Sequence, residues 1–340
     1  MSNYWRGKNV LITGINGFIG GNLAKKLICE NANVFGLIRN STQCTLLYYE
    51  DLVKKITVIE GDLVEKDLLA RIVSEEHITN VFHLAAQVEV GVGISNPFLT
   101  FETNIKGTYC LLEAVRQYST DVKSIVVAST DKSYGQYGRN MMPYKEDYPL
   151  IPRYPYDTSK ACADMISRSY ASDVFELPIV VTRFSNIFGP GQLNFSALIP
   201  DAIRSAIGYS NFIPRGDGSQ VRDFLFVDDV VDLYLKIGQQ VEENPKKYRE
   251  EVFNAGSNCP KSVKEVIIEV YEAIGNKSGL NNVLTSMRDK QTTGEIDCQY
   301  MDFEKTNRYF GWYPKHSFGE GLSKTIKWFK DYLIHQQSIV

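Results

Sequence analysis

A tyrosine and a lysine four residues apart, Tyr156 and Lys160, offer the chemistry of hydroxyl oxidation. They stand at the start of a segment with helical periodicity. Residues four apart share one helical face, so both side chains can reach one cavity. A nearby positive charge lowers the pKa of a tyrosine, and a phenolate is the base that removes a hydroxyl proton. Such pairs also occur by chance at surfaces, so the interpretation needs a second motif.

The second motif is a glycine turn, residues 14–20, which reads Gly-Ile-Asn-Gly-Phe-Ile-Gly. It joins an apolar run, predicted as a strand, to a helix-like stretch. Glycines permit the tight turn and the close backbone approach that a pyrophosphate needs, and the helix N-terminus adds N–H donors. The spacing departs from the commonest fingerprint, and glycines at such a turn are often only steric. The order strand, turn, helix favours a dinucleotide site formed by Gly14, Asn16, Gly17, Phe18, Ile19 and Gly20.

The end of the second predicted strand indicates which dinucleotide binds. An acid there binds the ribose 2′-hydroxyl of NAD, whereas an arginine accommodates the 2′-phosphate of NADP. The chain has Arg39 and no acid, which favours NADP over NAD, although an arginine at a strand end can also simply reach for solvent. Asp62, with Leu63 beside it, follows the third strand and is a candidate to bind the adenine; its alternative is a turn aspartate.

Strand-like and helix-like segments alternate through the first half of the chain. The apolar runs are continuous, which indicates strands that are buried on both faces. Helix-length segments between them predict right-handed crossovers and a doubly wound parallel α/β sheet of the Rossmann type. The expected strands are 9–13, 34–38, 56–59, 80–84, 124–128, 179–182 and 252–254, and the expected helices include 18–30, 65–76, 100–118 and 158–171.

The character of the chain changes after Asn186, where proline and glycine become frequent. We expect residues 1–186, with a returning segment near 224–257, to form the NAD(P)-binding domain. Residues 187–223 and 258–340 are expected to form a smaller α/β lobe that binds the substrate.

The composition excludes several classes of protein. The 340 residues carry 37 Lys and Arg against 40 Asp and Glu, a net charge of −3, which gives no basic surplus for nucleic acid. No apolar run is long enough to cross a bilayer, and the N-terminus lacks the apolar core of a signal peptide. The 6 cysteines and 4 histidines are scattered, so no metal site is expected. We expect a cytoplasmic protein without nucleic-acid or membrane partners.

The two motifs, with His83-Leu84-Ala85-Ala86 and Ser129-Thr130 after the fourth and fifth strands, resemble the extended short-chain dehydrogenase/reductase superfamily. The similarity continues through 222–229 and 311–314 and so spans almost the whole chain. These enzymes act on nucleotide-diphosphate sugars. The resemblance implies that Thr130, Tyr156 and Lys160 form the oxidising triad. It further implies that Leu84, Ala85, Ala86, Tyr156 and Lys160 contact the cofactor, and that helices 100–118 and 158–171 pair in a homodimer or homotetramer.

The two residues after Thr130 separate the branches of this superfamily. Epimerases carry small residues that do not titrate there, whereas many sugar-nucleotide 4,6-dehydratases carry Asp-Glu as acid and base. This chain has Asp131 and Lys132, which resembles the CDP-glucose 4,6-dehydratases and some UDP-N-acetylglucosamine dehydratases. The segment around Arg39 instead resembles NADP-using GDP-mannose 4,6-dehydratases. The nucleotide of the substrate therefore stays open among CDP-, GDP- and UDP-linked hexoses.

Our hypothesis is that Tyr156 takes the C4 hydroxyl proton while hydride passes from C4 to a tightly bound, recycled nicotinamide. The 4-ketone acidifies the C5 proton, which Lys132 removes if burial and neighbouring Lys160 favour its neutral amine. Asp131, kept protonated, donates to the departing C6 hydroxyl, and hydride returns to C6. Acid and base roles are expected where the environment pushes the pKa values of two neighbouring groups apart. The plain alternative is that both residues are solvated loop charges.

By resemblance, the sugar nucleotide lies between the lobes. Asn186 is expected on the diphosphate side, and the planar guanidinium of Arg222 suits a phosphate. The other substrate candidates are Gln87, Glu89, Ser129, Leu193, Leu198, Arg204 and Arg288. The mundane alternatives are a turn residue for Asn186, an ion pair with Asp223 or Asp228 for Arg222, and a core position for Leu198.

Two rival functions remain. The first is a sugar-nucleotide 4-epimerase or reductase with the same triad, against which Asp131 and Lys132 argue. The second is a non-catalytic NADP-binding sensor, because a fold does not determine a function. The intact triad argues against the sensor.

Overall fold

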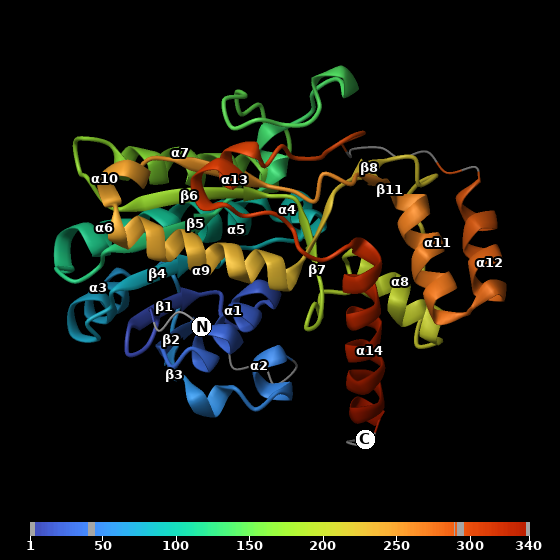
Figure 1. Ribbon diagram of the computed structural model, residues 1–340, viewed down its shortest axis with the longest axis horizontal. Coiled ribbons are helices and arrows are strands. Elements are labelled where there is room, and N and C mark those ends of the chain that lie inside the picture. The colour runs from blue at the N-terminus through green and yellow to red at the C-terminus, as the bar shows by residue number, and fades with distance from the viewer. Residues whose placement is uncertain (1–3, 40–44, 289, 291–295, 338–340) are drawn as a thin grey trace.

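A seven-stranded sheet, parallel throughout, forms the centre of the molecule (Figure 1). The computed structural model describes residues 4–39, 45–288, 290 and 296–337. The strands lie in the order β10-β6-β5-β4-β1-β2-β3, which confirms the predicted doubly wound α/β fold. Their bounds are β1 Asn9–Thr13, β2 Asn33–Ile38, β3 Thr57–Glu60, β4 Asn80–His83, β5 Ser124–Ala128, β6 Ile179–Phe184 and β10 Val252–Ala255.

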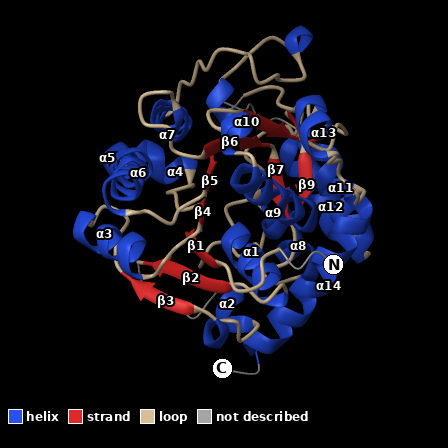
Figure 2. Ribbon diagram, turned by 60° about the vertical axis from the view of Figure 1, so that its left-hand side comes forward, coloured by secondary structure: helices blue, strands red, loops and turns tan. Residues whose placement is uncertain are grey.

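Helices cover both faces of this sheet (Figure 2). On one face lie α1 (Phe18–Cys29) and α9 (Val227–Glu243), and on the other lie α3 (Lys66–Glu75), α6 (Gly107–Tyr118) and α7 (Pro155–Ala171). The position of β1 between two layers of helices explains why its sequence is apolar without interruption. Val10 and Ile12 pack into the core on the side of α1 and α9, whereas Leu11 packs into the core on the other side. Both faces of the strand are buried, as a covered parallel sheet requires.

The predicted helix 100–118 is interrupted in the structure. α5 (Pro97–Phe101) is followed by one π-helical turn, Glu102–Lys106, before α6 begins. An extra residue per turn rotates the side chains that follow, and such turns often occur at functional sites. Helix α7 starts three residues before the predicted position, because Pro155 occupies its first turn, where proline is favoured. Tyr156 therefore already lies within the helix.

The remaining elements surround this sheet. Strand β7 (Asn186–Phe188) pairs in parallel with β9 (Phe224–Phe226), and β8 (Val221–Arg222) pairs antiparallel with β11 (Lys261–Ser262). Figure 1 shows α8, α11, α12 and α14 gathered on one side of the molecule. The other helices are α2 Leu46–Tyr49, α4 Val90–Ser95, α8 Leu198–Ile207, α10 Pro245–Tyr248, α11 Val263–Ile274, α12 Lys277–Met287, α13 Glu304–Phe310 and α14 Phe318–Gln337. Three 3₁₀ turns are η1 Val53–Lys55, η3 Asp131–Tyr134 and η4 Arg139–Met141.

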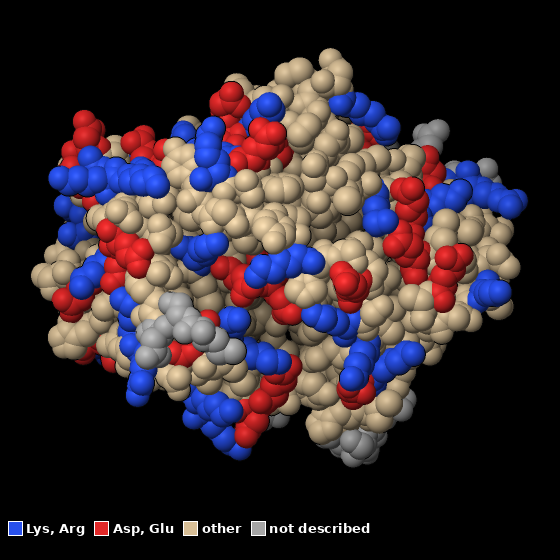
Figure 3. Space-filling model, viewed as in Figure 1, with Lys and Arg blue, Asp and Glu red and all other residues tan. Residues whose placement is uncertain are grey.

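Segment 224–257 returns to the main sheet as expected, because it supplies α9 and the edge strand β10 beside β6. The exact division into two domains stays a prediction. On the face seen in Figure 3, basic and acidic side chains are interspersed. Among the described residues, no helix is both long and apolar enough to cross a membrane, and no group of three or more His, Cys, Asp or Glu side chains is placed to hold a metal ion.

Candidate active site

The structure brings Thr130, Tyr156 and Lys160 together at the end of β5. Thr130 lies two residues after the end of this strand and is the N-cap of η3. Tyr156 and Lys160 lie in the first turns of α7. The Thr130 hydroxyl and the Tyr156 phenol are hydrogen-bonded. The Lys160 ammonium is buried and donates to the Ala128 carbonyl, which fixes it beneath the end of the strand. The arrangement can hold a hydroxyl-bearing carbon against a proton acceptor.

The electrostatics of the phenol differ from the prediction. Burial raises the pKa of Tyr156 rather than lowering it, and the carboxyls of Asp131 and Asp157 raise it further, against the hydrogen bond from Thr130. Burial lowers the pKa of Lys160 to about 8, opposed by Asp164. The prediction from the sequence considered the positive charge of Lys160. It did not consider the burial of the phenol or the negative charges of Asp131 and Asp157. The phenol therefore needs a further positive charge nearby before it can act as a base.

Asp131 has the environment of a proton donor. Its side chain is 2% exposed, and burial raises the pKa of its carboxyl. One oxygen, Oδ1, accepts a hydrogen bond of 3.0 Å from the Thr130 hydroxyl. The other oxygen, Oδ2, is buried and has no hydrogen-bond partner among the described residues. Since an unpartnered buried oxygen penalises the ionised form, the carboxyl is suited to keep a proton and to offer it to a substrate.

Lys132 follows Asp131 on η3. Its side chain is half-buried, and its positive charge favours the ionised forms of Asp131 and Asp157, against the effect of burial on the pKa of each carboxyl. Its role as a base stays a prediction. The backbone N–H of Lys132 donates to the Thr130 hydroxyl at 3.4 Å, which keeps the residue beside the triad.

A buried network ties η3 to α7. Arg183 on β6 is 1% exposed and forms a two-pronged ion pair with Asp164 on α7, at 2.7 and 3.1 Å. The same guanidinium donates to the Tyr134 hydroxyl at 2.9 Å, and this hydroxyl donates to Asn254 at 2.8 Å. Tyr134 is the last residue of η3. The turn η3 is therefore held in place by β6, α7 and β10 together.

Sequence reasoning missed two polar residues of the site. Asn104, which lies in the π-helical turn, exchanges hydrogen bonds of 2.7 and 3.0 Å with the backbone of Gln87 and donates to the Ser159 hydroxyl at 2.8 Å. No local pattern marks such a bridge between distant segments. Asp157 lies next to Tyr156 and is buried. The sequence could have indicated this residue, because Asp157 stands inside the Tyr-x-x-x-Lys motif, directly after Tyr156.

The glycine turn has the shape of a dinucleotide cradle. Gly14 has a φ of +75°, and a Cβ there would come within 2.7 Å of the Ala85 backbone nitrogen. A Cβ on Gly20 would overlap the Gly14 carbonyl. Helix α1 begins with Gly17 as its N-cap, without a side-chain cap and without an acid in its first turn. The tight turn and the uncapped N–H donors fit a pyrophosphate, so the residues present fit a nicotinamide dinucleotide.

The other predicted cofactor residues differ in their position relative to the glycine turn and in their burial. Leu84, Ala85 and Ala86 follow β4 beside the glycine turn. Arg39 is exposed just past the end of β2, and residues 40–44 after it lie outside the described part of the chain. The Asp62 carboxylate accepts a hydrogen bond from the Val64 backbone at 3.2 Å, as a turn aspartate does. Leu63 is buried in the core on the α6 side.

Arg222 is a substrate candidate whose charge reaches the acidic side chain of η3. It is buried, donates to the Val221 carbonyl at 2.9 Å, and its charge acts on Asp131. The Asn186 side-chain amide donates to the backbone carbonyl of Asp223 at 3.2 Å. This contact is compatible with a turn residue and with a ligand, so it does not distinguish the two predicted roles. The Ser129 hydroxyl lies 3.1 Å from that of Ser133.

The remaining substrate candidates differ in their burial and in their local contacts. Gln87 donates to the Glu89 carbonyl at 3.0 Å. Arg204 is engaged by Asp201 and Ser210, at 3.1 Å each. Leu193 and Leu198 are partly buried against the core, and Arg288 is exposed after α12.

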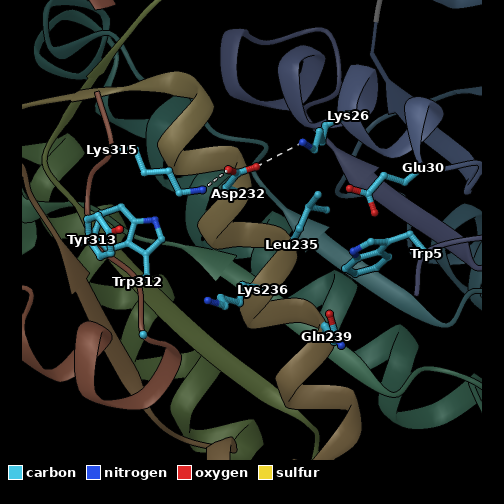
Figure 4. Close-up of a pocket in the computed structure, with 11 residues that line it drawn as sticks. Trp5, Lys26, Glu30, Asp232, Leu235, Lys236, Gln239, Trp312, Tyr313 and Lys315 are labelled. Atoms are coloured by element: carbon cyan, nitrogen blue, oxygen red, sulfur yellow. Dashed lines mark hydrogen bonds and ion pairs between the residues drawn. The ribbon is translucent and has the colours of Figure 1, made fainter. Parts of the chain in front are cut away.

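Two hollows of the surface lie away from this constellation. The first, of about 250 Å³, is lined by α9, α1 and the segment 311–315 (Figure 4). In it Asp232 lies between Lys26 and Lys315, at 3.5 and 3.1 Å. The second, of about 430 Å³, is lined mainly by charged side chains of the segments 145–147, 250–252 and 302–308. Neither includes a triad residue, so the site is assigned from the chemistry of its side chains and not from the depth of a hollow.

Comparison with known families shows which family the chain belongs to. The family model described as GDP-mannose 4,6 dehydratase matches residues 11–325. The chain belongs to this family. The match covers both the glycine turn and the triad and continues far into the C-terminal lobe.

Relatives of the dehydratase family match along almost the whole chain. The dTDP-D-glucose 4,6-dehydratase of Homo sapiens is 29% identical over 332 residues, which are 95% of this chain and 90% of that protein. The structure of dTDP-glucose 4,6-dehydratase from Bacillus anthracis in complex with NAD is 29% identical, with a TM-score of 0.81 and coverage of 96% and 97%. The UDP-glucose 4-epimerase of Thermotoga maritima, solved with UDP-glucose, is 28% identical, with a TM-score of 0.81 and coverage of 96% and 99%. The fold is thus shared by dehydratases and epimerases, and the site must distinguish them.

Proposed function

We propose that this chain is a sugar-nucleotide 4,6-dehydratase, a carbon–oxygen lyase that converts an NDP-hexose to an NDP-4-keto-6-deoxyhexose. The observation that carries the proposal is Asp131. It is a buried carboxyl that is hydrogen-bonded to the triad through Thr130, with its second oxygen unpartnered. A 4-epimerase or a reductase needs no acid at this point, whereas loss of the C6 hydroxyl as water does.

The cofactor is held by the glycine turn, by Leu84, Ala85 and Ala86, and by Tyr156 and Lys160. When bound, a nicotinamide dinucleotide supplies the hydride acceptor for C4 and then the hydride donor for C6. We favour NADP because Arg39 follows β2 where an acid would select NAD. NAD, which the Bacillus anthracis relative binds, is the alternative.

Protons follow the hydrogen bonds of the site. Tyr156 takes the proton of the C4 hydroxyl. Lys132 takes the proton of C5 after C4 has become a ketone, and it returns a proton to C5 once C6 has received the hydride. Asp131 gives its proton from Oδ2 to the C6 hydroxyl, which leaves as water. Tyr156 then passes the C4 proton through the Thr130 hydroxyl to Oδ1 of Asp131. The hydrogen-bond chain thereby restores both the phenolate and the protonated acid for the next turnover.

The substrate and the assembly belong to this proposal. Arg222 and Asn186 are assigned to the diphosphate, with Gln87, Glu89 and Ser129 on the hexose side and Leu193, Leu198, Arg204 and Arg288 towards the nucleotide. CDP-glucose and GDP- or UDP-linked hexoses remain the candidates. For a homodimer or homotetramer, support comes from exposed apolar side chains at the α5–α7 surface, where Phe98 is 73% and Met165 is 57% exposed.

The test is mass spectrometry of the purified protein in heavy water, with NADP or NAD and a panel of CDP-glucose, GDP-mannose, UDP-N-acetylglucosamine, UDP-glucose and dTDP-glucose. We expect one sugar nucleotide to lose one water and to gain deuterium at C5. An unchanged mass with a new isomer would mean a 4-epimerase and would remove Asp131 and Lys132 from the chemistry. Cofactor binding without turnover of any panel member would favour the sensor.

A further inference from the structure

Three titratable side chains outside the proposed active site form a line of hydrogen bonds where α9 and α14 begin. Asp229 lies in the first turn of α9 and is 1% exposed. Its carboxylate lies 2.9 Å from Nδ1 of His316, and Nε2 of the same imidazole lies 2.9 Å from the amine of Lys324 on α14. The order of carboxylate, imidazole and nucleophile is that of a hydrolytic triad, with an amine in place of a hydroxyl.

The hydrogen bonds determine which nitrogen of the imidazole carries the hydrogen. A carboxylate only accepts, so Nδ1 of His316 donates to Oδ1 of Asp229. An ammonium only donates, so Nε2 keeps its lone pair and accepts from Lys324. The backbone N–H of His316 donates to the other oxygen of Asp229, Oδ2, at 3.0 Å. The carboxylate thus orients the imidazole as a general base towards the lysine.

The amine at the end of this line reaches the solvent. The side chain of Lys324 is 51% exposed, whereas that of His316 is mostly covered. The ring of Phe226 lies against both groups, with its centre 4.8 Å from that of the imidazole and 5.3 Å from the amine. A reagent from solution can therefore approach the amine while the imidazole stays in place behind it.

A neighbouring ion pair on α9 shows what a plain surface contact looks like. One turn along the helix, Asp232 accepts from Lys315 at 3.1 Å, and Lys315 is 58% exposed. At Lys324 the nearer partner is the imidazole, at 2.9 Å, while the carboxylate of Asp228 lies 3.8 Å away. A neutral imidazole stabilises an ammonium less than a carboxylate does, and it can take the proton. The contact at Lys324 therefore favours release of the amine more than the contact at Lys315 does.

We propose that Lys324 is a site of N-acylation by acyl phosphates, and that Asp229 and His316 form the base that activates its amine. The choice of an anionic reagent rests on the surface nearby. Asp232, four residues from Asp228 and so on the same face of α9, lies in a hollow that is also lined by Lys26, Lys236 and Lys315 (Figure 4). Clustered ammonium groups raise the local concentration of an anion.

Two protons leave the nitrogen during this step. The ammonium of Lys324 first gives one proton to Nε2 of His316, which passes it to solvent. The lone pair of the amine then forms a C–N bond to the acyl carbon, and the C–O bond to the phosphate breaks. The second proton leaves with the phosphate. The product is an amide on Lys324 with no positive charge, so the ion pair with Asp228 is lost.

The experiment treats the full-length protein with acetyl phosphate and follows acetylation over time. Unreacted lysines are then capped with deuterated acetic anhydride, and mass spectrometry of the peptides gives the acetylated fraction at each lysine. In the wild type we expect Lys324 to react about 10-fold or more faster than Lys315, because a positioned base accelerates proton transfer. In His316→Gln the rate at Lys324 should fall to about that of Lys315. The matched control is His77→Gln, because His77 is also bonded to a carboxylate, that of Asp121, and should leave both rates unchanged.

The rate at Lys315 in each variant shows whether the surface is intact, since this lysine has no part in the line. Equal rates at Lys324 and Lys315 in the wild type overturn the inference. A preference for Lys324 that persists in His316→Gln also overturns it, because the imidazole is then not the base. If His316→Gln does not fold, Asp229→Asn is judged by the same ratio of rates. The measurement uses no sugar nucleotide, so its result is independent of the proposed function.

Discussion

The two halves of the proposed site are built in different ways. The oxidation half, Tyr156 and Lys160, lies on a 17-residue helix, and Lys160 is 6% exposed. The elimination half, Asp131 and Lys132, lies on a single 3₁₀ turn, and Lys132 is half-exposed. The helix is held by packing along its length, whereas the turn is held by Arg183 and Asn254 through Tyr134. The shared oxidation chemistry is therefore built into the scaffold, and the reaction-specific chemistry is added on a short turn that can change alone.

Removing the phenol should have the largest effect, because it disables the step on which both halves depend. For Tyr156→Phe we expect a loss in kcat of roughly 1,000- to 10,000-fold, the upper range for a positioned general base. Neither water loss nor reduction of the bound cofactor should be seen on mixing with substrate. Cofactor binding, measured by fluorescence titration, should remain, which separates lost chemistry from lost structure.

Breaking the link between the halves should affect both. Arg183→Met removes the two-pronged partner of the buried Asp164 and leaves it only the longer ion pair with Arg168, at 3.5 Å. We expect this to cost about 3–5 kcal/mol in the free energy of unfolding. Urea denaturation measures this cost. The control is Arg116→Met, which removes an exposed ion pair with Glu113 and should cost less than about 1 kcal/mol. Equal stability of the two variants would contradict the anchoring role of Arg183.

Asp131→Asn should separate the halves. Asparagine keeps the shape of the side chain but cannot donate a proton to the C6 hydroxyl, so we expect a loss of water elimination of about 100- to 1,000-fold. Cofactor reduction should persist, because Tyr156 and Lys160 are unchanged. A stopped-flow trace in which the reduced cofactor appears and does not disappear is the expected result. Simultaneous loss of both signals would mean that the halves act as one unit.

The smallest expected effect is a gain in stability. The folded-state pKa of Asp157 is about 6, above the unfolded value of 3.8. As the pH rises between these values, the unfolded chain gives up its proton first, so the folded state loses stability over this window. Asp157→Asn removes that cost and should be more stable than the wild type by about 2 kcal/mol at pH 7. Urea denaturation at pH 4 should show little difference between the two proteins.

Local patterns in the sequence predicted the scaffold well, for identifiable reasons. The continuous apolar run 9–13 indicated a strand buried on both faces, and the structure places its side chains in both cores. The proximity of Tyr156 and Lys160 was predicted because a helix determines which residues share a face, whereas Thr130 was assigned by the family resemblance. The burial of Asp157 beside Tyr156 was missed, because burial depends on the packing of other elements around α7. The bridge through Asn104 was missed, because a π-helical turn leaves no periodicity in the sequence. Burial and long-range charge, not local pattern, decide these features.

The segment between η3 and α7 has a consequence for engineering. It rises at the top of Figure 1 and is attached to the C-terminal part of the chain, through a pair of hydrogen bonds between Arg139 and Asp297 at 2.6 and 2.8 Å and through backbone pairing of Tyr144 with Tyr300. Asn254 joins the same assembly from β10. A chimera that exchanges the C-terminal segment to obtain a new nucleotide preference would thus also replace the supports of the elimination turn. Such exchanges should carry the 135–153 segment with them as a single cassette.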